Sequence, residues 1–145
     1  MIAKISLIYL FIIFSVGVLV AQDQEKLDQT YTLYAIGKVV KNDGRTFIVI
    51  DEKYQDGLLG LENYKEVTVV YWFDLNDTPE KRSILQVHPR GNVENPIRGV
   101  FATHAPVRPN LIAISRCVII KVEKNIIEID DIDAFDGSPV LDLKN

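Results

Sequence analysis

The sequence predicts a single, mainly β domain. β-branched and aromatic residues, which favour strands, dominate the runs 46–50 and 67–73. Two further apolar runs, 111–122 and 125–132, are separated by the polar residues of a hairpin. The Asp-Gly pair inside Asn42-Asp43-Gly44-Arg45 supplies the positive φ angles that a two-residue turn needs. A chain of 145 residues has room for one such domain with a modest core.

The elements before residue 74 are two hairpin strands, a short helix and a buried strand. Residues 30–40 alternate loosely between apolar and polar side chains, which predicts a first strand that pairs with 46–50. Leucines in 53–63 follow a spacing compatible with a short helix. The run 67–73 is almost continuously apolar, so we expect a buried strand there.

After residue 74, turns separate the remaining strands. Asn76-Asp77-Thr78-Pro79 predicts a turn, and 83–87 predicts a short strand. The runs 111–122 and 125–132 predict two longer strands. Asp136-Gly137-Ser138-Pro139 predicts a closing turn, whose acidic side chains either accept hydrogen bonds from a ligand or are simply solvated.

The run from Gly99 to Asn110, GVFATHAPVRPN, differs from its apolar flanks. Its two prolines exclude both a helix interior and a central strand. Small residues let the backbone approach a ligand closely, and the side chains of Thr103, His104 and Arg108 are hydrogen-bond donors. The composition fits a binding loop, and it equally fits a surface loop that the prolines stiffen.

Charge is distributed unevenly along the chain. The net charge of −4 argues against indiscriminate binding to nucleic acid. However, residues 81–116 contain six basic residues and one acidic residue, Glu94. This window predicts a face that attracts phosphate or another anion. The alternative is that its arginines pair with the carboxylates of 128–142.

The N-terminus predicts export or membrane anchoring. Residues 5–21 follow Lys4 and carry no charge, which predicts an apolar helix that is either a signal peptide or a membrane anchor. The apolar length lies between those typical of the two, and we favour the anchor. A buried core helix is the alternative. Residues 22–30 form a polar spacer, so the domain itself would span 31–145.

Cysteine and histidine are scarce. Cys117 lies in an apolar run and has no partner for an internal disulfide, so we expect a buried, inert thiol. His88 and His104 are the only histidines, and no cysteine or carboxylate cluster accompanies them at ligand spacing. We therefore predict no metal site.

Several ordered blocks resemble one known family. They are His88–Asn92, Gly99–Asn110 and Asp133–Lys144, and the resemblance reaches back through 57–64 and 69–73, so it covers residues 36–144. The blocks are similar to the TsaA-like domain of the tRNA N6-threonylcarbamoyladenosine methyltransferases. That family uses S-adenosylmethionine and is built on a small β-barrel. The resemblance implies a barrel with short helices, a homodimer and no metal.

The resemblance also implies roles for individual residues. Phe101 would pack on the cofactor, His104 stands where the family usually has arginine, and Asp74 stands where it commonly has histidine. The implied cofactor-binding residues are Asp74, Phe101, Ala102, Thr103, His104, Ile114, Asp133, Asp136 and Gly137. The implied substrate-binding residues are Arg90, Arg108 and Asn110. No catalytic residue is assigned, because the sulfonium methyl group is already activated.

Two functions follow as hypotheses. The first is an S-adenosylmethionine-dependent methyltransferase acting on N6 of threonylcarbamoyladenosine in tRNA. The second is a non-catalytic ligand-binding module on the same fold. An exported or membrane-anchored location favours the second, because a tRNA substrate requires the cytoplasm. His104 and the short 42–45 turn, where the family often carries a longer loop that reaches the cofactor, also favour it. A purely structural barrel is the weakest reading.

Overall fold

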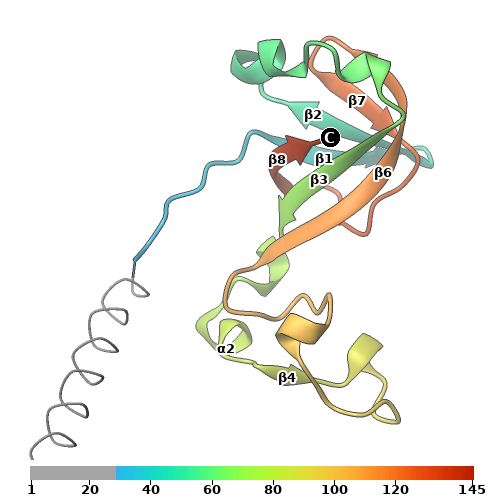
Figure 1. Cartoon of the computed structure of the whole chain (residues 1–145). Coiled ribbons are helices and arrows are strands. Elements are labelled where there is room, and N and C mark those ends of the chain that lie inside the picture. The colour runs from blue at the N-terminus through green and yellow to red at the C-terminus, as the bar shows by residue number, and fades with distance from the viewer. Residues whose placement is uncertain (1–28) are drawn as a thin grey trace, which may run out of the picture. The chain divides into compact units, whose positions relative to one another are not determined.

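Six antiparallel strands close into a barrel in the computed structural model of this chain (Figure 1). Their spatial order is β1-β2-β7-β6-β3-β8, and pairing of β1 with β8 closes the barrel. The bounds are β1 (Gly37–Asn42), β2 (Arg45–Ile50), β3 (Glu66–Trp72), β6 (Ile112–Glu123), β7 (Ile126–Ile129) and β8 (Pro139–Lys144). The predicted mainly β barrel is therefore confirmed.

The structure describes residues 29–145. The predicted apolar helix, with its reading as a signal peptide or anchor over 1–21, and most of the spacer 22–30 lie outside the described residues. Within 29–145, no helix has the length and apolar character needed to span a membrane.

The β1–β2 hairpin forms as predicted. Asp43 and Gly44 both have positive φ, 49° and 74°, which is the geometry of the turn that an Asp-Gly pair favours. However, the strand begins at Gly37 and not at residue 30. Because β2 ends at Ile50, which pairs with Gly37, residues before Gly37 have no partner on β2.

Alternation of side chains places one face of β3 in the core. Val67, Val69 and Tyr71 point inward and are buried, whereas the residues between them are only half-buried. The strand predicted as buried is thus buried on one face. Strand β8, which pairs with both β1 and β3, has no counterpart among the predicted elements.

The remaining elements are short. The helix predicted over 53–63 is two 3₁₀ turns separated at Gly60, whose φ is 88°. The strand predicted over 83–87 is reduced to two residues, because only these pair with β5. The bounds are η1 (Glu52–Leu58), η2 (Leu61–Asn63), η3 (Asp74–Asn76), α2 (Pro79–Arg82), β4 (Gln86–Val87), η4 (Pro89–Gly91), β5 (Arg98–Gly99) and η5 (Val100–Ala102).

Residues 73–111, which we call the lobe, connect β3 to β6. The lobe leaves one end of the barrel and contains η3, α2, η4, η5 and the small β4–β5 sheet, while η1 and η2 lie at the other end (Figure 1). The predicted binding loop, 99–110, is therefore part of the lobe.

Cys117 lies on β6 inside the barrel, as predicted, and is 2% exposed. Burial raises the pKa of its thiol to about 11. At pH 8 the reactive thiolate then makes up roughly one thousandth of the Cys117 side chains, whereas it makes up roughly a quarter of an ordinary cysteine with pKa ~8.5. We expect no labelling by a disulfide reagent at pH 8 until the protein is unfolded in urea. Stoichiometric labelling of the native protein within minutes would contradict this burial.

Candidate functional site

Two adjoining cavities lie where the barrel meets the lobe. The first cavity has a volume of about 530 Å³ and the second of about 420 Å³. They share four lining residues: Tyr71, Phe73, His104 and Asp133. The first cavity is also lined by Phe101, Ala102, Thr103, Arg108, Ile112, Ala113, Ile114 and Ser115, and the second by Asp74, Leu75, Asn76, Lys81, Pro106, Ala134, Phe135 and Ser138. Both volumes fall in the range typical of small-molecule sites.

Hydrogen bonds within 99–110 hold the loop that lines the first cavity. Val100 is 1% exposed, and its carbonyl accepts from Thr103 Oγ1 at 3.2 Å and from Arg108 Nη2 at 3.1 Å. Thr103 Oγ1 in turn accepts from the backbone N–H of Ala105 at 3.2 Å. The loop is therefore braced, yet it leaves Phe101 79% exposed beside the cavity. A large apolar side chain held exposed by a braced loop is available to a ligand.

Tyr71 forms the wall that the two cavities share. Its hydroxyl donates to the backbone carbonyl of Asp133 and accepts from Ser115 Oγ at 3.4 Å. Burial raises the pKa of Tyr71, so the phenol stays protonated and remains a donor at neutral pH. Its ring also packs edge-on against Phe73, with centroids 5.7 Å apart. The hydrogen bond from Tyr71 to Asp133 fixes the loop after β7 against β3.

The loop after β7 contributes some of the predicted residues to the cavities but not others. Asp133 lines both cavities, whereas Asp136 and Gly137 line neither. Asp136 Oδ1 accepts from the backbone N–H of Lys41 at 2.8 Å, and the Gly137 N–H donates to Val39 O at 2.8 Å. These two residues hold the turn against β1, and their cofactor role remains a prediction.

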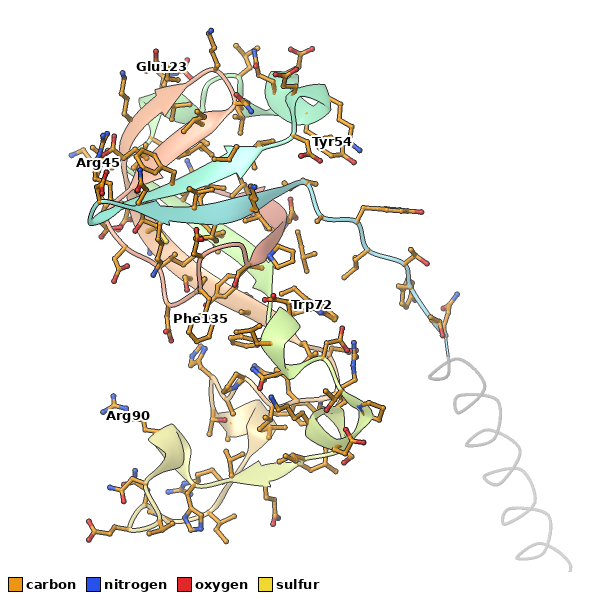
Figure 2. All side chains as sticks on the ribbon, turned by 180° about the vertical axis from the view of Figure 1, so that it is seen from behind. Arg45, Tyr54, Trp72, Arg90, Glu123 and Phe135 are labelled. Atoms are coloured by element: carbon orange, nitrogen blue, oxygen red, sulfur yellow. The ribbon has the colours of Figure 1, made fainter. Side chains whose placement is uncertain are left out.

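Asp74 and Phe135 belong to the second cavity. An oxygen of Asp74 is 3.4 Å from the hydroxyl of Ser138, which donates to it. Phe135 extends from the barrel towards the lobe and is 68% exposed (Figure 2). The second cavity therefore combines a carboxylate with an exposed aromatic ring.

The predicted substrate residues are not gathered in one place. Arg108 lines the first cavity, whereas Arg90 and Asn110 line neither cavity. Arg90 is exposed on η4 and projects outward from the lobe (Figure 2). Among residues 29–145, no arginine of the basic window pairs with the carboxylates of 128–142. Instead, Arg82 pairs with Asp77 and Arg116 with Glu66, while Arg90 and Arg108 form no ion pair with a described residue.

Several residues that line the cavities were not singled out from the sequence, among them Tyr71, Ser115 and Phe135. Tyr71 on β3 and Ser115 on β6 are joined by a hydrogen bond between their hydroxyls, and Phe135 follows β7. Strand alternation was the available signal for Tyr71, because it continues the inward series of β3. In the part of the chain that the structure describes, no group of histidine, cysteine and carboxylate side chains is arranged to hold a metal ion.

Comparison with known proteins gives a consistent result. Residues 36–145 match the model of the tRNA-methyltransferase O N-terminal domain. A probable S-adenosyl-L-methionine-binding protein of Methanocaldococcus jannaschii is 45% identical over 114 residues, which cover 79% of this chain and 90% of that protein. Another, of Pyrococcus horikoshii, is 45% identical over 105 residues, covering 72% and 75%. An S-adenosyl-L-methionine-binding protein of Archaeoglobus fulgidus is 41% identical over 103 residues, covering 71% and 70%.

Solved structures share the fold. The crystal structure of TrmO from Pseudomonas aeruginosa superposes with a TM-score of 0.59 at 25% identity, covering 80% of this chain and 54% of that one. A further crystal structure of TrmO gives a TM-score of 0.60 at 26% identity, covering 80% and 57%. This chain therefore spans little more than half the length of these solved chains.

Proposed function

The chain belongs to the tRNA-methyltransferase O N-terminal domain family, and from that membership we propose that it binds S-adenosylmethionine and transfers its methyl group to a nitrogen acceptor. The observation that carries the proposal is the gathering of Phe101, Thr103, His104 and Asp133, from two distant loops, around the two adjoining cavities. The family resemblance implies a cofactor-binding role for each of these four residues.

The cofactor would lie across both cavities, bent at the wall they share. Phe101 packs on an apolar face of it, and the backbone of Ala102 and Thr103 offers polar contacts. The carboxylates of Asp74 and Asp133 accept hydrogen bonds from its amino group or ribose hydroxyls. His104, which lines both cavities, takes the place of the arginine implied by the family resemblance. It can donate a hydrogen bond, but it lacks the two-pronged guanidinium.

The chemistry is a direct displacement. Bound S-adenosylmethionine supplies an activated methyl group, so the nitrogen lone pair forms the new N–C bond as the C–S bond breaks and S-adenosylhomocysteine leaves. The proton that the acceptor nitrogen loses passes to bulk solvent as the product leaves the site. The chain's own contribution is to align the two reactants and to exclude water from them. No side chain is assigned as a base.

The acceptor implied by the family is N6 of threonylcarbamoyladenosine in tRNA. Arg108 at the first cavity and the exposed Arg90 would contact phosphate, which is supported by the lack of any ion pair to either within residues 29–145. Because phosphate contacts release counterions, methylation of tRNA should weaken steeply with salt.

The alternative function is a non-catalytic ligand-binding module. His104 and the two-residue turn at Asp43-Gly44 favour it, since both remove contacts that the resemblance implies. Export or anchoring by residues 5–21 remains part of this alternative, and protease protection in intact cells tests it. Cleavage of the domain from outside the cell would disfavour a tRNA substrate.

One titration followed by one assay separates these functions. The full chain is titrated with S-adenosylmethionine in a calorimeter, and the methyl group is then followed from labelled cofactor into tRNA that carries threonylcarbamoyladenosine without the N6-methyl group. We expect saturable heat and transfer to tRNA. Heat without transfer would support the binding module. No heat at millimolar cofactor would remove the methyltransferase proposal.

The proposal includes a homodimer formed through β6. Its outward face carries Ile114, Val118 and Ile120, which are about half exposed, and Ile114 also lines the first cavity. A stripe of β-branched side chains on a barrel surface is costly to leave in water. We expect the Val118→Lys/Ile120→Lys double variant to be monomeric by light scattering, while the Ile126→Lys variant, altered on β7, keeps the native mass. A monomeric native protein would contradict the dimer.

A further inference from the structure

Arg82 connects the only tryptophan of the chain to the binding loop. It is the last residue of α2, the single helical turn that Thr78 caps by accepting from the N–H of Lys81. Its Nε donates to Asp77 Oδ1 at 2.8 Å, and its Nη1 donates to the carbonyl of Pro109 at 2.8 Å. Its guanidinium carbon lies 5.3 Å from the ring centroid of Trp72.

The partners of Arg82 hold one another in place. Trp72 Nε1 donates to Asp77 Oδ2 at 3.1 Å, so both oxygens of that carboxylate are occupied. These hydrogen bonds, first from Arg82 and then from Trp72, lower the pKa of Asp77, which therefore stays charged at neutral pH. The guanidinium is thus oriented by a charge on one edge and an aromatic face beside it. We call Trp72, Asp77 and Arg82 the clamp.

The hydrogen bond from Arg82 to the carbonyl of Pro109 connects the clamp to the loop that lines the first cavity. Among the described residues, Arg82 supplies the only side-chain hydrogen bond that reaches loop 99–110 from outside it. Pro109 directly follows Arg108, which lines the first cavity. Beyond it, the chain is fixed by the bond from Phe73 N–H to Leu111 O at 2.9 Å. The clamp therefore sets where the loop turns back towards β6.

We propose that Arg82 is a positioning residue, which holds Pro109 so that Arg108 and the loop keep the shape of the first cavity. The proposal rests on the function proposed above only for its ligand, S-adenosylmethionine. Arg82 lines neither cavity, so it acts through the loop and not by contact. Lysine replaces it only in part, because one ammonium group does not reproduce the planar fork that meets Asp77 and Pro109 together.

The chain contains its own reporter for this coupling. Trp72 is the single tryptophan, and its indole is held by Asp77 and stacked by Arg82. A ligand that shifts loop 99–110 should therefore move Arg82 against the indole and change the emission of Trp72. An Arg82 that merely stabilised the fold would not make that emission depend on the ligand.

The test compares Arg82→Ala and Arg82→Lys with Arg98→Ala in the full chain. Arg98 is an exposed arginine of β5 in the same lobe, and no side-chain hydrogen bond or ion pair of it is found within residues 29–145. Affinity for S-adenosylmethionine is measured by calorimetry at a temperature where urea curves show every variant folded. We expect roughly tenfold weaker binding for Arg82→Ala, a smaller loss for Arg82→Lys and none for Arg98→Ala.

Two further measurements isolate the coupling. In an Arg108→Ala background, Arg82→Ala should cost less affinity than it does alone, because the residue through which it acts is already gone. Ligand addition should change Trp72 emission in the native protein and not in Arg82→Ala. A folded Arg82→Ala with native affinity and a native emission change would overturn the proposal.

Failure of the proposed function gives a different result. If the native protein binds no S-adenosylmethionine, the proposed methyltransferase function is rejected. The role of the clamp in holding the loop is then tested by hydrogen exchange of the backbone amides in 99–110. The Arg82→Ala and Arg82→Lys variants should exchange faster there than Arg98→Ala does. Equal exchange rates in the three variants would overturn the clamp itself.

Discussion

Replacing Gly37 with alanine is expected to destabilise the barrel severely. Gly37 lies where β1 pairs with β2 at Ile50 and with β8 at Val140, which is the closing seam of the barrel. A Cβ atom there would overlap the carbonyl oxygen of Val49 and lie 2.8 Å from the Cα of Ile50. Both atoms are backbone, so the clash cannot be relieved by a side-chain rotation. We expect a loss of about 3 kcal/mol, at the upper end of the usual cost of overpacking.

Gly57→Ala is the matched control. Gly57 lies in η1, its φ is not in the left-handed region, and a Cβ atom there would meet nothing within 4 Å. Its replacement should change the free energy of unfolding by less than about 1 kcal/mol, in the stabilising direction. Urea unfolding followed through Trp72 measures both variants. If Gly37→Ala unfolds at the same urea concentration as the native protein, β1 and β2 must lie farther apart at Gly37 than they do in the structure.

Local patterns predicted the elements whose partners are near in sequence. The hairpin at 42–45 follows from Asp43-Gly44 alone, because the turn geometry needs only those two residues. The β6–β7 hairpin is equally local, with Lys124 at a φ of 54° in its turn. Strand β8 was missed, because its pairing with β1 and β3 joins residues far apart in sequence.

The residues of the site divide in the same way, into those recognisable from local sequence and those that depend on contacts between distant residues. Loop residues such as Phe101 and His104 were predicted because they lie within one continuous sequence block, which can be recognised without knowing the fold. Tyr71 was missed, because its role depends on a hydrogen bond to Asp133, which is 62 positions later. Conversely, Asp136 was included in the predicted site because it shares a sequence block with Asp133, yet its carboxylate turns to Lys41. Neighbours in a tight turn point in different directions.

Removing the ring of Phe101 should abolish much of the cofactor affinity without weakening the fold. The side chain is 79% exposed, so Phe101→Ala gives up little buried surface in the free protein. In the complex, however, the ring would stack on the adenosine or pack on the apolar part of the cofactor. Such stacking contributes about 1–3 kcal/mol per base, which corresponds to roughly 5- to 150-fold in the dissociation constant. Calorimetry of S-adenosylmethionine binding measures the loss.

Leu59→Ala provides the comparison that gives this result its meaning. Leu59 is more exposed than Phe101, at 92%, and lies between η1 and η2, away from both cavities. Removal of either side chain therefore deletes exposed apolar surface, and only Phe101 should change the affinity. Equal affinity in the two variants would mean that the cofactor does not contact the Phe101 ring. Hydrogen bonds among Val100, Thr103 and Arg108 hold the loop that exposes Phe101. If the Phe101 ring does not contact the cofactor, these hydrogen bonds do not serve cofactor binding through that ring.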